Sequence, residues 1–130
     1  MNNKLGVDSR KKSSKILTDV LEKSFSFEDA FQKSINNTKY KIRSEDKAFV
    51  YMLTSSVLRF LTQIDFTLDK LLKKSIKKLP DNPKMSLRIG LAQLFILKTP
   101  KHAAVSTSVD ITKSKWKGLV NAILRQIIRE

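Results

Sequence analysis

The apolar residues of this chain recur at steps of three and four positions, which is the spacing of one face of an α-helix. The pattern is clearest near the end of the chain, where one face is filled by Leu119, Val120, Ile123, Leu124, Ile127 and Ile128. Strict alternation of apolar and polar residues, which is typical of a half-buried strand, is scarce. The sequence therefore predicts an all-α protein.

The same spacing predicts a compact helical bundle of about seven helices. Ser44 and Asp65 are suitable N-caps for the third and fourth helices. The fifth helix is apolar on much of its circumference, so it is expected to lie at the centre of the bundle. The seven helices are expected at about Ser9–Ser24, Phe27–Asn36, Ser44–Leu61, Asp65 to the break at Pro80, beyond Pro83 to Lys98, His102–Ser114, and from Gly118 onward.

The length of 130 residues suits one domain with a single sizeable core. We expect a flexible basic N-terminal tail over residues 1–8, followed by a helical domain over residues 9–130. The chain has no Cys, which fits a reducing compartment and excludes disulfides and thiolate metal sites. Since no apolar run is long enough for a signal peptide or a membrane span, we expect a cytoplasmic protein with no membrane partner.

Positive charge is the strongest functional signal in the composition. The chain has 26 basic and 12 acidic residues, for a formal net charge of +14. Such an imbalance costs self-repulsion and most often accompanies a polyanionic partner. A composition rich in lysine for other reasons is the alternative explanation.

The parts that an enzyme needs are missing from the sequence. His102 is the only histidine, so neither a multi-histidine metal site nor a cysteine–histidine pair can form. There is no glycine-rich phosphate loop, and the paired carboxylates lie at predicted helix starts, where capping explains them. We therefore expect a non-enzymatic chain with no catalytic residue, no metal and no cofactor.

The first candidate RNA-binding cluster is basic and lies near the N-terminus. It consists of Arg10, Lys11, Lys12 and Lys15. We expect these residues on the first turns of a helix, where the helix dipole disfavours positive charge. Contact with phosphate would offset that cost, because each neutralised phosphate releases counterions. The alternative is a frayed, solvated helix end.

The second candidate is a stripe of Lys117, Asn121, Arg125 and Arg129, which step by four along the last helix. Arginine's planar fork suits phosphate and base edges, and asparagine can read a base edge. Other roles stay open: Asn121 can hold a loop, the stripe can meet another domain, and Arg125 can pair with Asp65 or Asp110.

Other basic and aromatic residues have simpler explanations. Arg59 and Arg88 follow buried-looking helix turns, where arginine usually pairs with a carboxylate or caps carbonyls. Trp116 either packs on the last helix or stacks on an unpaired base. The lysines at positions 70, 73, 74, 77 and 78 are expected to form a solvated face that adds non-specific attraction.

Four motifs, in order along the chain, carry a family resemblance. They are Ser55–Arg59 with Ile64–Asp65, Leu87–Leu94, Pro100–Val105 and Gly118–Arg125. In this order and at these intervals they resemble the NusB/RsmB domain family, which includes a bacterial antitermination factor and the N-terminal module of a 16S rRNA cytosine-5 methyltransferase. Val57–Arg59 and Asn121–Arg125 look more like the methyltransferase branch.

The resemblance implies a NusB-like fold of two packed helical sub-bundles that binds RNA, often beside a protein partner. It does not carry over methyltransferase activity, because the catalytic domain of that branch would follow Glu130. We expect an RNA-binding domain that acts on ribosomal RNA or its precursor, with a ribosomal or transcription-complex protein or a C-terminal methyltransferase domain as partner. The alternatives are a stand-alone NusB-like antitermination factor that binds leader RNA with a ribosomal-protein partner, and a protein-interaction module without RNA.

Overall fold

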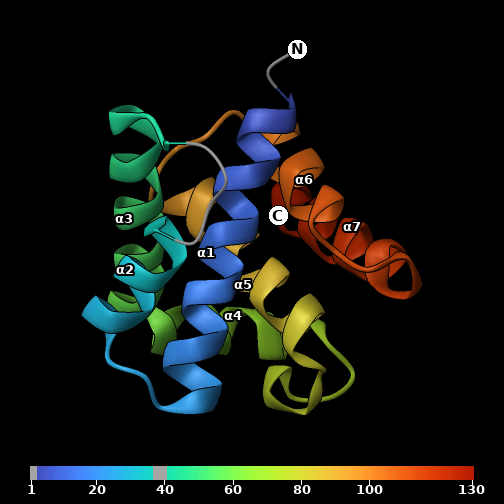
Figure 1. Cartoon of the computed structure of the whole chain (residues 1–130). Helices are drawn as coiled ribbons and strands as arrows, with labels where there is room; N and C mark the ends of the chain where they lie inside the picture. The colour runs from blue at the N-terminus through green and yellow to red at the C-terminus, as the bar shows by residue number, and fades with distance from the viewer. Residues whose placement is uncertain (1–2, 37–40) are drawn as a thin grey trace.

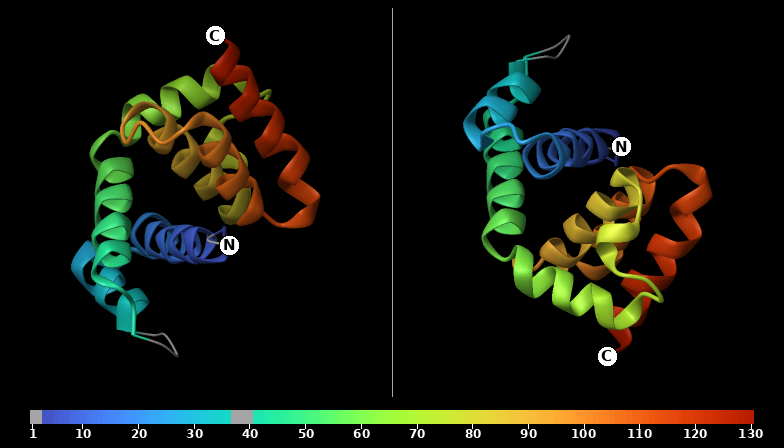
Figure 2. Two further views of the ribbon diagram at one scale, coloured as in Figure 1. Left: turned by 90° about the horizontal axis from the view of Figure 1, so that it is seen from above. Right: turned by 90° about the horizontal axis from the view of Figure 1, so that it is seen from below.

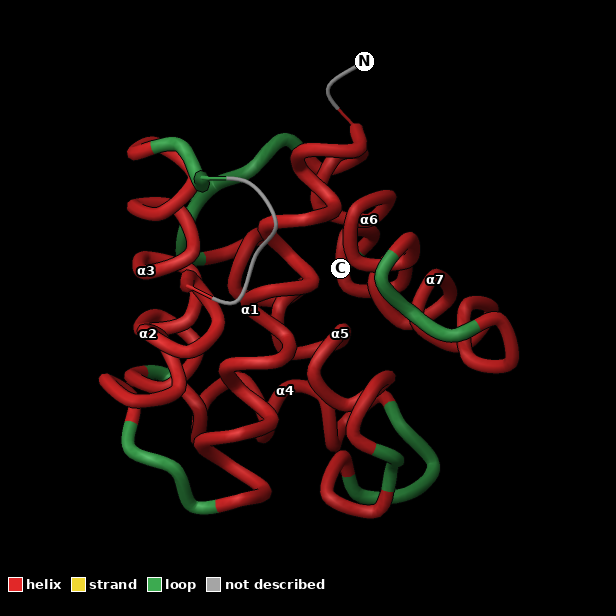
Figure 3. The backbone as a smooth tube through the Cα atoms, viewed as in Figure 1, coloured by secondary structure: helices red, strands yellow, loops and turns green. Residues whose placement is uncertain are grey.

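The computed structural model describes residues 3–36 and 41–130, and within these ranges it contains helices and no strands (Figures 1 and 3). The prediction of an all-α protein with about seven helices is confirmed. None of the helices in this part of the chain is both long and apolar enough to cross a lipid bilayer. The elements are α1 (Asn3–Lys23), α2 (Phe27–Asn36), α3 (Ser44–Arg59), α4 (Leu61–Leu71), the 3-10 helix η1 (Ile76–Lys78), α5 (Asp81–Phe95), α6 (Lys101–Asp110) and α7 (Ser114–Arg129).

Helix α1 begins at Asn3 and not near Ser9, so residues 3–8 of the expected tail are helical. Residues 1–2 of that tail lie outside the described residues. The helix ends where Ser24 takes a left-handed conformation with φ of 61°, and the Phe25 amide donates back to the carbonyl of Asp19 at 3.0 Å. This hydrogen bond closes the C-terminal end of the helix.

The start of the fourth helix was predicted wrongly. Helix α4 begins at Leu61, so Asp65 lies inside the helix and not at its N-cap. The helix also ends earlier than expected, at Leu71, and η1 forms a separate turn. The Asp69 carboxylate accepts the Ile76 amide at 2.7 Å and holds that turn against the end of α4.

Helices α5 and α7 begin earlier than predicted. Helix α5 begins at Asp81 and includes Pro83 in its first turn, where a missing amide hydrogen costs nothing. Helix α7 begins at Ser114, before the expected start near Gly118. Helix α5 ends at Phe95, and Lys98 has a φ of 57°, so the chain turns before Pro100.

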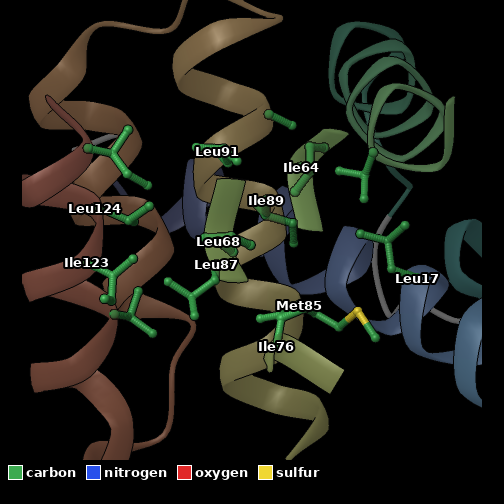
Figure 4. Close-up of a cluster of buried hydrophobic side chains, with 14 of the residues drawn as sticks. Leu17, Ile64, Leu68, Ile76, Met85, Leu87, Ile89, Leu91, Ile123 and Leu124 are labelled. Carbon is green, nitrogen blue, oxygen red and sulfur yellow. The ribbon is translucent and has the colours of Figure 1, made fainter. Parts of the chain in front are cut away.

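Helix α5 lies at the centre of the molecule, as predicted. It contacts α1, α3, α4, α6 and α7, and every residue from Pro83 to Gln93 is buried. In Figure 4, Leu87, Ile89 and Leu91 of α5 lie among Leu17 of α1, Ile64 and Leu68 of α4, and Ile123 and Leu124 of α7. The main core of the protein therefore forms around this one helix.

A second, smaller core joins the first three helices. It contains Ile16 of α1, Ala30, Phe31 and Ile35 of α2, and Val50 of α3. Figure 2 shows α1–α3 grouped on one side of the molecule and α4–α7 on the other. The arrangement of two packed sub-bundles, which the family resemblance implies, is confirmed.

Gly90 allows close packing at the centre of the α4–α7 sub-bundle. A Cβ atom at this position would lie 2.6 Å from Cδ1 of Leu124 on α7 and 3.1 Å from Oγ of Ser108 on α6. Such distances are too short for ordinary packing, and Leu124 is fully buried. The absence of a side chain at Gly90 therefore sets how closely α6 and α7 approach α5.

A buried ion pair joins α4 to α5. Arg88 donates from Nε to Oδ1 of Asp65 at 2.9 Å and from a terminal nitrogen to Oδ2 at 2.8 Å. The two side chains are only 4% and 12% exposed. Two parallel hydrogen bonds to one carboxylate make a strong and directional contact. The expectation that Arg88 has a structural role is confirmed.

We expect the variant Arg88→Met to lose about 3–5 kcal/mol of unfolding free energy, because it leaves the Asp65 carboxylate buried without its partner. The double variant Asp65→Leu/Arg88→Met should be more stable than Arg88→Met alone, since no unpaired charge remains. Urea unfolding followed by circular dichroism measures both. The single variant Asp65→Leu completes the comparison. If the losses of unfolding free energy in Asp65→Leu and Arg88→Met add up to the loss in the double variant, the two side chains are not energetically coupled.

Candidate nucleic-acid interface

The basic residues predicted near the N-terminus lie in the middle of α1. Because α1 starts at Asn3, Arg10, Lys11, Lys12 and Lys15 are several residues from its N-terminus. The dipole effect falls off within the first turn, so the electrostatic cost assumed in the sequence prediction does not apply. The side chains of Lys11 and Lys15 are exposed, whereas those of Arg10 and Lys12 are half-buried.

Arg10 directs its guanidinium group toward the protein interior. Nε and one terminal nitrogen donate to Oε1 of Gln93 at 3.0 and 2.7 Å, and the other terminal nitrogen donates to the carbonyl of Gly6 at 3.2 Å. The group also lies over the ring of Phe49, 4.4 Å from its centre. Burial lowers the pKa of Arg10 below its usual value, because an apolar surrounding disfavours the charged form.

Gln93 extends this contact to α6. It is fully buried, and its side-chain amide nitrogen donates to Oγ of Ser108 at 3.2 Å and to Oγ1 of Thr107 at 3.4 Å. Arg10 and Gln93 thus connect α1, α5 and α6 through polar contacts. Sequence reasoning missed this role for Gln93, because a glutamine within an apolar helix does not reveal its partners.

The three lysines of α1 meet one lysine of α2 around a shallow hollow of about 200 Å³. We call it the lysine hollow. It is lined by Lys11, Lys12, Lys15 and Lys33, with Asp19 and Ser34. The packing of α2 on α1 brings Lys33 to this place, and the hydroxyl of Ser34 donates to the carbonyl of Lys12 at 3.4 Å. The sequence prediction did not include Lys33.

Carboxylates neutralise only part of the charge in the lysine hollow. Lys12 pairs with Asp8 at 2.8 Å, and Lys15 pairs with the buried Asp19 at 3.0 Å. Both pairs are spaced four residues apart on α1. Lys11 and Lys33 form no ion pair within the described ranges, and both are exposed. The Lys33 ammonium lies 5.2 Å from the centre of the Phe25 ring. The hollow therefore contains ammonium groups without an ion pair beside ion-paired ones.

The predicted stripe on α7 points partly toward solvent. Arg125 and Arg129 are exposed, and Lys117 and Asn121 are half-buried. Nε of Arg125 donates to Oδ1 of Asn121 at 2.9 Å. This contact holds the guanidinium along the helix and leaves its two terminal nitrogens available for a ligand.

Two alternatives for Arg125 find no support. Asp65 is already engaged by Arg88, and no ion pair joins Arg125 to Asp110 in the part of the chain that the structure describes. The stripe also lies apart from the lysine hollow, because α7 packs on α5 and α6 while α1 and α2 pack on each other. The structure does not bring the two predicted clusters into one site.

The other candidate residues, which are named singly in the sequence prediction, lie on or near the surface. His102 is exposed near the start of α6, and Arg59 is exposed over the ring of Phe60, 5.5 Å from its centre. Trp116 is half-buried, and the Lys115 ammonium lies 5.5 Å from its ring. Within residues 3–36 and 41–130, no group of three or more His, Asp and Glu side chains is placed to hold a metal ion.

Comparison with known proteins identifies the family to which the chain is related. A model of the NusB family matches residues 7–129. Ribosomal RNA small subunit methyltransferase B of Cronobacter sakazakii is 31% identical over 96 residues, which cover 71% of this chain and 22% of that protein. The same enzyme of Escherichia coli O1:K1 is 33% identical over 94 residues, which cover 69% and 22%. The match thus spans about a fifth of the length of these relatives.

Solved structures show the same fold at low identity. A chain in the crystal structure of a plectonemic RNA supercoil has a TM-score of 0.87 at 21% identity, covering 99% of this chain and 96% of that one. A chain in the complex of antitermination factors NusB and NusE with dsRNA has a TM-score of 0.81 at 21% identity, covering 99% and 98%. NusB of T. maritima also has a TM-score of 0.81, at 17% identity, covering 100% and 92%. With a family model that matches nearly its whole length and a fold shared with NusB, the chain belongs to the NusB family.

Proposed function

We propose that this chain is a non-enzymatic RNA-binding domain that acts on ribosomal RNA or its precursor, in the cytoplasm. The observation that carries the proposal is the lysine hollow, where four ammonium groups from two helices surround one depression. Flexible lysine side chains suit the phosphate backbone, because their ammonium groups bind the phosphate charge and do not distinguish one base from another. The domain would therefore position RNA and would not read much of its sequence.

The relatives support ribosomal RNA as the target. Those at 31–33% identity are named ribosomal RNA small subunit methyltransferases, and the match covers 22% of their length. In such a protein, a domain like this one would hold the RNA while another domain performs the chemistry. We favour this role for the chain.

A second role is favoured by a different observation. The structural match to the chain in complex with NusE and dsRNA spans 99% of this chain and 98% of that one. A stand-alone antitermination factor that binds leader RNA with a ribosomal-protein partner would need only such a domain. The two roles share the RNA contact and differ in the protein that accompanies it.

Within the predicted site, we assign different roles to neighbouring residues. Lys11, Lys12 and Lys15, together with Lys33, would contact phosphate. Arg10 would act as a positioning residue, because three of its nitrogens already donate inside the protein. On α7, Arg125 and Arg129 would contact RNA, with Lys117 beside them and Asn121 orienting Arg125.

The variant Lys11→Gln/Lys33→Gln tests the lysine hollow. Both side chains are exposed and lack ion pairs, so the fold should be unaffected. We expect weaker binding to a 16S rRNA fragment, and a plot of log affinity against log salt concentration whose slope is smaller by about 1.4 units for two lost contacts to single-stranded RNA. Fluorescence anisotropy at several salt concentrations measures this.

The control Lys47→Gln/Lys101→Gln removes the same charge from exposed positions outside the hollow. It should keep the wild-type slope. Equal losses in both variants would mean that only total charge matters. A wild-type affinity that does not change with salt would contradict the electrostatic mechanism altogether.

The variant Arg10→Met tests the positioning role. Oε1 of the buried Gln93 would lose both donors, so we expect a loss of about 1–3 kcal/mol of unfolding free energy. The salt slope of RNA binding should stay at its wild-type value under conditions where the variant is folded. A slope that falls by about one unit with unchanged stability would instead identify Arg10 as an RNA contact.

The variant Arg125→Gln/Arg129→Gln tests the α7 stripe. We expect several-fold weaker RNA binding with unchanged stability, because both side chains are exposed. The single variant Arg125→Lys should bind RNA more tightly than the double variant but more weakly than the wild type, since lysine keeps the charge but lacks the planar fork. If RNA affinity is unchanged in the double variant, the stripe is not an RNA contact, and its role as a surface for another protein domain gains support.

A further inference from the structure

A second concentration of positive charge lies where two connections meet, away from the lysine hollow. We call it the lysine corner. Four of its lysines belong to the connection between α4 and α5, one belongs to the connection between α6 and α7, and one lies in the first turn of α7. All six are exposed: Lys73, Lys74, Lys77, Lys78, Lys113 and Lys115.

Asn82 brings these two connections together. Its side-chain nitrogen donates to the carbonyl of Ile111 at 3.0 Å, and its side-chain oxygen accepts the amide of Lys113 at 2.7 Å. Asn82 lies in the first turn of α5, four residues after Lys78. Figures 1 and 2 show both connections on the same side of the molecule.

The backbone that carries the lysines is held in place. Ile76 is fully buried in the main core, and its amide donates to Asp69 of α4 at 2.7 Å. The Ser75 hydroxyl accepts the amide of Lys77 at 3.3 Å. The lysines therefore extend from a fixed turn, which limits the entropy that a ligand must remove from the backbone.

Little negative charge compensates for these lysines. The nearby acidic residues are Asp69, Asp81 and Asp110, and none forms an ion pair with a corner lysine in the described part of the chain. In the lysine hollow, by contrast, two of four lysines are paired. Like charges gathered on neighbouring segments repel one another, and a polyanion would offset that repulsion.

Phosphate backbone suits the lysine corner better than a membrane does. Surfaces that bind lipid combine lysine with exposed apolar side chains. The exposed large apolar residues of the described chain are Phe25, Tyr51, Met52, Phe66 and Phe95, and none belongs to either connection. We propose that the lysine corner is a second contact for the RNA phosphate backbone. The proposal rests on the RNA-binding function proposed above and adds a separate surface to it.

The test compares two variants of the full chain with equal net charge. Lys73→Gln/Lys74→Gln/Lys77→Gln/Lys78→Gln neutralises the corner, and Lys41→Gln/Lys47→Gln/Lys98→Gln/Lys101→Gln neutralises four exposed lysines elsewhere. For binding to the 16S rRNA fragment, we expect the salt slope of the corner variant to fall by about 3 units for four lost contacts. The control should keep the wild-type slope. Thermal unfolding checks that both variants are folded.

A second measurement locates the contact directly. Acetylation of surface lysines, read by mass spectrometry, should slow several-fold at Lys73, Lys74, Lys77 and Lys78 when RNA is added, and should not change at Lys98 and Lys101. Unchanged acetylation at the corner together with a wild-type slope for the corner variant would overturn the proposal, as would equal losses in both variants.

The outcomes separate this inference from the proposed function. If Lys11→Gln/Lys33→Gln weakens binding and the corner variant does not, the lysine hollow stands and the corner is not an RNA contact. If the wild-type chain shows no salt-dependent RNA binding, both are wrong. If the corner binds vesicles rich in anionic lipid while RNA leaves its acetylation unchanged, the corner is a membrane surface and the proposal is overturned.

Discussion

Helix α5 is enclosed by five other helices, and its polar side chains must find partners inside the protein. Three of them reach across helix boundaries: Arg88 to Asp65 on α4, Gln93 to Arg10 on α1, and the buried Lys84 to Glu22 on α1 at 3.1 Å. Unpaired polar groups at this depth would cost several kcal/mol each. The polar contacts of α5 thus fix which helices surround it and in which register.

This constraint divides the basic residues into two classes. Arg10, Lys84 and Arg88 direct their charge inward and stabilise the contacts between helices. The exposed lysines of the lysine hollow and the lysine corner remain available to a ligand. The net charge of +14 therefore overstates the charge that a ligand can contact. A count of basic residues cannot make this distinction, because it depends on where each side chain ends.

The fold and the proposed RNA contacts belong to different parts of the same helices. The apolar faces of α1 and α2 form the smaller core, and their outward faces form the lysine hollow. One packing contact, that of α2 on α1, positions both the smaller core and the lysine hollow. The proposed methyltransferase and antitermination roles could share this surface, since exposed lysines would bind phosphate and not a particular partner.

The sequence by itself determined the all-α class, the number of helices to within about one, the central position of α5 and the family, because apolar periodicity and short motifs are local properties. It also indicated the α1 lysines and the α7 stripe, which each lie on one helix. It did not determine where α1, α4 and α7 begin. Only the tertiary structure decided that Asp65 pairs with Arg88 and does not cap α4, that Arg10 turns inward to Gln93, and that Lys33 joins the α1 lysines. Each of these contacts joins residues far apart in the chain, so no local pattern specifies them, and helix packing selects one partner among several.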